Sequence, residues 1–132
     1  MHRAVTDLLD QLAPIRTLPR TERPPVPLER HRSPTGCVLQ AANYAVTVSW
    51  FNEEKGGSFG ELHVIVWRGT VARPGATRHT KGATIVSEII LYPIEPPEDG
   101  RVWRATDGTC YDSIGLVAKI LSLADEQDRE ST

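Results

Sequence analysis

Five side chains that can carry positive charge gather in and just before residues 72–82, which read ARPGATRHTKG. They are Arg68, Arg73, Arg78, His79 and Lys81. Guanidinium and ammonium groups bind carboxylates and phosphates, including those of a nucleic-acid backbone. Because long connecting segments often carry function, we predict that residues 72–82 are the best binding candidate in the body of the chain. A charged, solvated loop without a ligand is the alternative.

The four histidines do not form a metal-binding pattern. His2, His31, His63 and His79 show no HxH or HxxxH spacing, and the two cysteines form no CxxC pair. Zinc sites and metalloprotease helices depend on such close pairs. We therefore predict no metal site and no cofactor, and we interpret His63, which lies among apolar residues, as a structural histidine.

The sequence offers no strong catalytic candidate. Cys110 lies close to Asp107 and Asp112, and neighbouring negative charge disfavours the thiolate that would act as a nucleophile. The carboxylate pairs at residues 53–54 and 98–99 lie in predicted turns, where they are expected to be solvated. We assign no catalytic residue, and the sequence favours a non-enzymatic function without deciding the question.

Length and charge limit the possible functions. A chain of 132 residues, 39% of them hydrophobic, predicts one domain with a modest core. The net charge is −2 and is uneven, because six Lys/Arg and four Asp/Glu precede Gly36 whereas nine and thirteen lie after it. A weakly acidic body argues against strong binding of nucleic acid over the whole surface.

The sequence also predicts a cellular location. No run approaches the roughly 18 apolar residues of a membrane-spanning helix, and the first residues lack the apolar centre of a signal peptide. We therefore expect a cytoplasmic protein that does not bind membranes. In that compartment Cys37 and Cys110 are expected to be free, buried thiols.

The stretch Glu61–Val71, ELHVIVWRGTV, predicts a strand that the other elements must surround. Side chains alternate between the two faces of a strand, so Val64 and Val66 share one face and Ile65 and Trp67 share the other. A strand with one solvated face alternates apolar and polar residues, and this one does not. Both of its faces therefore need a covering layer.

Three further strands and a helix complete the predicted domain, residues 36–126. The strands are Gly36–Asn52 (with a bend near residues 41–43), Ala83–Ile94 and Arg101–Thr106, and the helix is Ser113–Ala124, capped by Asp112 or Ser113. We predict an α+β fold: a four-stranded, mainly antiparallel sheet in ββββα order with the C-terminal helix on one face. This order is similar to that of ββββα single-strand-binding proteins, which implies nucleic-acid binding only by analogy of fold.

Two segments precede this domain and one follows it. Residues 1–13 predict a short amphipathic helix, which packs on its own domain or on another protein through Leu8, Leu9 and Leu12. Residues 14–35 hold six of the ten prolines and five arginines. Because proline lacks a backbone donor, they predict an extended arm that cannot join a central sheet. Residues 127–132 predict a polar, frayed tail.

Together these features favour a small, cytoplasmic, non-enzymatic interaction protein. We expect it to form a homodimer and to bind a protein partner through its N-terminal helix, its arm and a sheet face. The partner-facing residues would be Leu8, Leu9, Leu12, Ile65 and Trp67. A symmetric dimer is a common way to cover the second face of such a sheet.

Two alternatives stay open. One is a nucleic-acid-binding module that uses residues 72–82, with Trp50, Trp67 or Trp103 as stacking platforms for bases. The other is a small-ligand-binding protein or enzyme with its pocket between the sheet and the helix.

Overall fold

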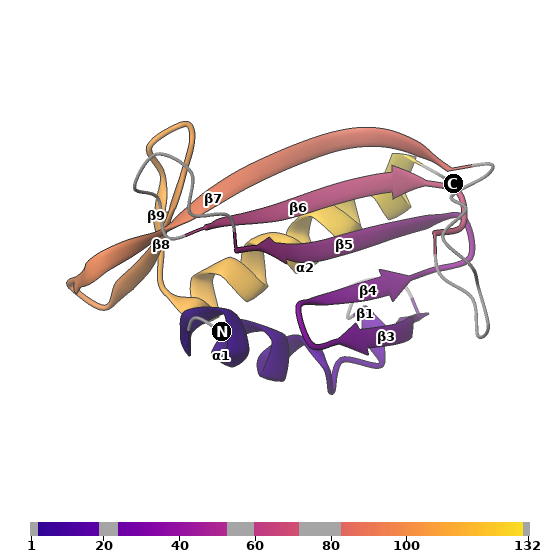
Figure 1. The fold of residues 1–132 in the computed structure, drawn as a ribbon. Coiled ribbons are helices and arrows are strands. Elements are labelled where there is room, and N and C mark those ends of the chain that lie inside the picture. Colours follow the sequence, from indigo (N-terminus) through magenta and orange to yellow (C-terminus); the bar gives the residue numbers. More distant parts are fainter. Residues whose placement is uncertain (1–2, 19–23, 53–59, 72–82, 131–132) are drawn as a thin grey trace.

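The computed structural model describes residues 3–18, 24–52, 60–71 and 83–130 (Figure 1). Two helices and nine strands lie in these ranges, and the predicted α+β class is confirmed. The helices are α1 (Arg3–Leu12) and α2 (Ser113–Glu130). The strands are β1 (Thr17–Leu18), β2 (Val26–Pro27), β3 (Glu29–Ser33), β4 (Gly36–Gln40), β5 (Tyr44–Phe51), β6 (Glu61–Arg68), β7 (Thr84–Glu98), β8 (Arg101–Ala105) and β9 (Cys110–Tyr111).

Seven strands form one antiparallel sheet in the order β3-β4-β5-β6-β7-β8-β9, and β1 and β2 form a small sheet of their own. Every strand of the large sheet pairs with its neighbours in sequence, which makes the sheet a meander. The predicted antiparallel character is confirmed, but the predicted number of four strands is wrong. The bend predicted near residues 41–43 separates β4 from β5.

One of the additional strands, β3, comes from the predicted arm. Residues 14–35 were expected to stay outside the sheet, yet Glu29–Ser33 pairs with β4 along its whole length. This short run contains no proline, so every backbone donor is present, and an edge strand must bond on one side only. Arg32 Nη2 also lies 2.9 Å from Asp10 Oδ1 of α1, so the arm packs on its own chain.

Helix α1 forms at the predicted position because its apolar residues recur on one side of the helix. Val5, Leu8, Leu9 and Leu12 are completely buried and belong to the main hydrophobic core. The helix contacts α2 and β4. The prediction that Leu8, Leu9 and Leu12 face a partner is therefore wrong, since these side chains fill the core of a single chain.

Helix α2 begins at a side-chain cap and is longer than predicted. The Gly115 backbone N–H donates to Asp112 Oδ1 at 2.6 Å, which identifies Asp112 as the N-cap. The helix continues to Glu130, and Gln127 and Asp128 are buried. Residues 127–130 are therefore part of the packed domain and not of a frayed tail.

Both helices cover the same face of the large sheet, which we call the inner face. Alternate residues of β5 and β6 point toward them, and these positions are buried: Val46, Val48, Trp50, Leu62, Val64 and Val66. Leu116, Ile120 and Ala124 of α2 complete this layer. In Figure 1 α2 runs behind β5 and β6, with α1 beside it. The opposite face, which we call the outer face, is covered by no helix of the described chain.

Candidate interaction surface

Most of the predicted basic site lies outside the described residues. Arg73, Arg78, His79 and Lys81 belong to residues 72–82, for which no position is described. Arg68 ends β6, opposite Tyr44 on one side and Thr84 on the other, and is exposed. A binding role for these cations stays a prediction.

Two of the three tryptophans cannot act as stacking platforms for bases. Trp50 is 5% exposed and Trp103 is fully buried, and their rings meet edge to face at a centroid distance of 6.0 Å. Trp67 lies on the outer face and is half-buried, and its Nε1–H donates to Thr47 Oγ1 at 2.9 Å. Of the tryptophans, only Trp67 is placed to meet a partner.

The outer face carries a band of apolar side chains across β5, β6 and β7. Ile65 and Trp67 lie half-buried at its centre, as the sequence placed them. Phe51 is 47% exposed and Ile85, which pairs with Trp67, is 57% exposed. Large apolar side chains gathered on one open surface are typical of an interaction site.

Polar contacts cross the same face and hold His63 in place. Its Nε2 lies 2.9 Å from Glu61 Oε2, and its Nδ1 lies 3.7 Å from Glu88 Oε2 on β7. The Phe51 ring packs edge-on against the imidazole at 4.6 Å. These contacts agree with the structural role predicted for His63. Within the described ranges, no cluster of three His, Cys, Asp or Glu side chains is arranged to hold a metal ion.

Gln40, which sequence analysis did not single out, fixes the start of the connection between β6 and β7. Its buried Nε2 donates to the carbonyls of Ala41, Tyr44 and Gly69 at 2.6, 2.9 and 3.1 Å. Its Oε1 accepts from the Val71 N–H at 2.8 Å. A glutamine in a strand gives little sequence signal, because the same pattern fits a solvated edge position.

Strand β7 is shared between two neighbours and leaves part of one side open. Residues Thr84–Leu91 pair with β6, whereas the pairing with β8 extends only over Leu91–Glu98. On the side away from β6, no described strand pairs with Thr84–Ile89, which we call the β7 ledge. In Figure 1 β7 runs along the margin of the sheet, and β8 and β9 lie at one end of it. The sequence predicted a strand at Ala83–Ile94 but gave no indication of this ledge.

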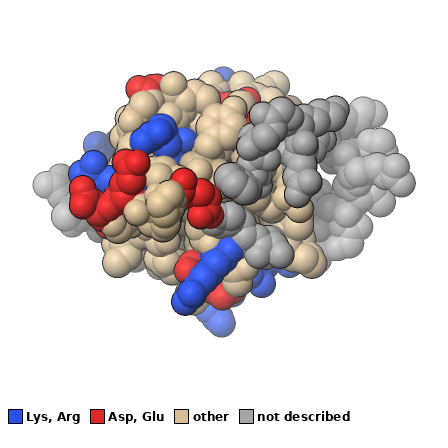
Figure 2. Space-filling view, turned by 60° about the vertical axis from the view of Figure 1, so that its left-hand side comes forward, with Lys and Arg blue, Asp and Glu red and all other residues tan. Residues whose placement is uncertain are grey.

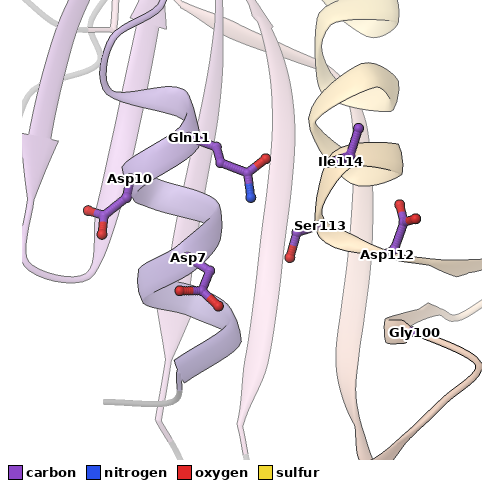
Figure 3. A pocket seen from close by; sticks show the side chains of 7 residues that line it. All are labelled: Asp7, Asp10, Gln11, Gly100, Asp112, Ser113 and Ile114. Atoms are coloured by element: carbon purple, nitrogen blue, oxygen red, sulfur yellow. The ribbon is translucent and has the colours of Figure 1, made fainter.

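A concave region lies between the two helices. This open hollow of about 570 Å³ is lined by Asp7, Asp10, Gln11, Gly100, Asp112, Ser113 and Ile114. Figure 3 shows Gln11 pointing into the gap between the helices, and Asp10 pointing to the other side of α1. Asp10 pairs with Arg32 and Asp112 caps α2, so two of the three carboxylates have structural roles. This is not the predicted pocket between sheet and helix.

The two cysteines are free and far apart in the sheet. Cys37 lies on β4 and Cys110 on β9, and four strands separate them. Burial raises the pKa of the Cys37 thiol above its ordinary value of 9.0, an effect that the nearby Arg32 and Arg30 oppose. Cys37 is buried as predicted, whereas Cys110 is only partly covered.

The surface charge is mixed. Figure 2 shows basic and acidic side chains interspersed on one side of the molecule. In the described parts of the chain, neither helix is long and apolar enough to cross a bilayer. Comparison of the chain with protein-family models, curated proteins and solved structures finds no match.

Proposed function

We propose that this chain is a small, cytoplasmic, non-enzymatic interaction protein whose protein partner at its open sheet surface is a second copy of the chain, so that it forms a homodimer. The supporting observation is the apolar surface of β5–β7. Phe51, Ile85 and Val86 are 47%, 57% and 40% exposed, and Ile65 and Trp67 lie beside them. Covering an apolar area of this kind with a second surface removes it from water and so lowers the free energy of the system.

A binding role fits this surface better than a catalytic one. The ionisable side chains near it include His63, which contacts Glu61 on its own strand and Glu88 on β7. They lie on the face of a sheet, and a catalytic group is more commonly found in a recess that excludes water. The hollow between α1 and α2 is open, and five of its seven lining residues have polar side chains.

A second copy of the chain is the simplest occupant of this surface. A two-fold axis places the same residues on both sides of an interface, so no separate complementary protein is required. A net charge of −2 per chain adds little repulsion between copies. The free thiols of Cys37 and Cys110 agree with the reducing environment of the cytoplasm.

Light scattering coupled to size-exclusion chromatography tests this proposal. The chain has a mass of 14.6 kDa, so we expect about twice that mass, falling toward one chain on dilution. Replacing Ile85 and Val86 together by lysine should shift the particle to the mass of one chain. The matched control is Ile114→Lys, since Ile114 is 75% exposed on α2, on the other side of the sheet. A chain that stays single up to about 1 mM, where binding is worth only about 4 kcal/mol, would contradict the homodimer.

A further inference from the structure

We infer that two copies associate by antiparallel pairing of the β7 ledge, Thr84–Ile89, with the same segment of the second copy. This inference rests on the homodimer of the proposed function and identifies its contact. The ledge is the margin of the open sheet surface, where the backbone groups directed away from β6 have no partner among the described strands.

The direction of the backbone groups on the ledge follows from two hydrogen bonds. The Thr106 N–H donates to the Ile90 carbonyl at 3.2 Å, so Ile90 directs its backbone groups away from β6. On β6, the Gly69 N–H donates to the Asn43 carbonyl near β5. The direction of the backbone groups alternates along a strand. Both bonds therefore lead to the same assignment of which β7 residues direct their backbone groups toward β6. Glu88, two residues before Ile90, directs its N–H and carbonyl toward the open side.

The other two margins of the sheet are protected, and the ledge is not. At one margin, β3 reads ERHRS, and charged side chains discourage pairing with another strand. At the other, β9 is only two residues long. The ledge reads TIVSEI, with three β-branched aliphatic residues, no lysine and no proline. A single bulge at Val86 interrupts its pairing with β6, but it lies before Glu88.

Self-pairing of the ledge is compatible with its charge. Glu88 is the one charged residue of this segment. In an antiparallel pair with its two-fold axis at the middle of the ledge, Glu88 lies opposite Ile85 of the second copy. The two Glu88 side chains are then about 10 Å apart along the strands, which is about one Debye length at 0.1 M salt. The apolar Ile85 and Val86 side chains gain neighbours in the same arrangement.

The pair of variants Glu88→Pro and Glu88→Ala tests this contact. Proline at residue 88 removes an N–H that points away from β6, so the β6–β7 bonds stay and the new pairing loses a donor on each copy. Alanine removes the same carboxylate and its contact with His63 but keeps the N–H. We expect Glu88→Pro to weaken the dimer at least about tenfold, since two hydrogen bonds are lost, and Glu88→Ala to retain the dimer mass in light scattering.

Amide hydrogen exchange of the unaltered protein gives a second measurement that does not depend on a variant folding. The Glu88 N–H should exchange slowly at concentrations where the dimer forms and rapidly after dilution to single chains. The N–H of Ile89, which points toward β6, is the internal control and should be protected at both concentrations. Rapid exchange at Glu88 within a dimer would overturn the inference.

The outcomes separate the two proposals. A chain of single mass at about 1 mM contradicts the homodimer and, with it, the ledge contact. A dimer that survives Glu88→Pro but is lost in Ile65→Lys, on the outer face, would place the contact on that face. The homodimer would then stand, and only the ledge pairing would be wrong. Far-UV circular dichroism shows whether Glu88→Pro is folded, and if it is not, the amide exchange of Glu88 in the unaltered protein decides the ledge pairing.

Discussion

Replacement of Gly60 by alanine should destabilise this protein strongly, because two separate costs arise at one residue. Gly60 directly precedes β6 and has a φ of 118°, where L-residues are strained. A Cβ atom there would lie 2.5 Å from Cζ2 of the Trp50 ring and 2.8 Å from the Phe51 carbonyl oxygen. The indole is buried and cannot move aside freely, since its ring also contacts the Trp103 ring.

The magnitude follows from these two contributions. A strained backbone conformation costs about 1–3 kcal/mol, and an extra methyl group in a packed core costs about 1–3 kcal/mol. Gly60→Ala should therefore lower the free energy of unfolding by roughly 2–6 kcal/mol, a large part of the 5–15 kcal/mol that is typical of a domain. Gly108→Ala is the matched control. Its φ of 92° carries the backbone cost, but no atom lies within 4 Å of the added Cβ.

Urea denaturation followed by tryptophan fluorescence measures both variants, because Trp50 and Trp103 are buried and report loss of the core. The difference between the two free energies of unfolding isolates the packing contribution, for which we expect about 1–3 kcal/mol. If Gly60→Ala is no less stable than Gly108→Ala, the Trp50 ring does not pack against residue 60, and the described position of Gly60 is wrong.

Four further predictions concern single side chains. Asp112→Ala should lower stability by about 1 kcal/mol through loss of the α2 cap, while Asp112→Asn should retain most of it, as urea denaturation will show. Gln40→Leu should cost about 2–4 kcal/mol, because several backbone groups lose their buried partner, and faster amide exchange at Val71 would locate the effect. Cys110 should react with iodoacetamide in the folded protein, and Cys37 only after unfolding, as mass spectrometry of the labelled peptides can establish. Because the pKa of Cys37 is raised in the folded state, its contribution to stability is present below pH 9.0 and is lost as the pH rises above that value.

Much of the secondary structure could be predicted because local patterns determine it. Three signals each specify one conformation over a few residues, and the structure confirms all three. The alternation from Tyr44 to Trp50 specifies a strand, the leucine spacing of α1 specifies a helix, and the carboxylate of Asp112 specifies the start of α2. The prediction failed for β3, because prolines on both sides of ERHRS outweighed a run that can form an edge strand. It also underestimated the length of α2. The residues buried near the end of this helix are the polar Gln127 and Asp128, which do not continue the apolar pattern.

The candidate surface was only half predictable. The alternation of Ile65 and Trp67 indicated a second apolar face, and the structure places both residues on the outer face. The β7 ledge gave no signal, since Ala83–Ile94 has apolar residues on both faces whether it has one neighbour or two. Strand length and neighbour order arise from the whole sheet. For the same reason, the sequence could not tell that Leu8, Leu9 and Leu12 would be used within the chain.

The contact between α1 and α2 has a consequence for how the chain folds during its synthesis. The meander can form strand by strand as the polypeptide leaves the ribosome, because each strand pairs with the one before it. The part of the inner face that α2 covers, however, stays exposed to solvent until α2 has been translated and can pack beside α1. Helix α2 lies at the far end of the described chain. A nascent chain stalled before Ser113 would therefore present to chaperones the part of the inner face that α2 covers on β5, β6 and β8.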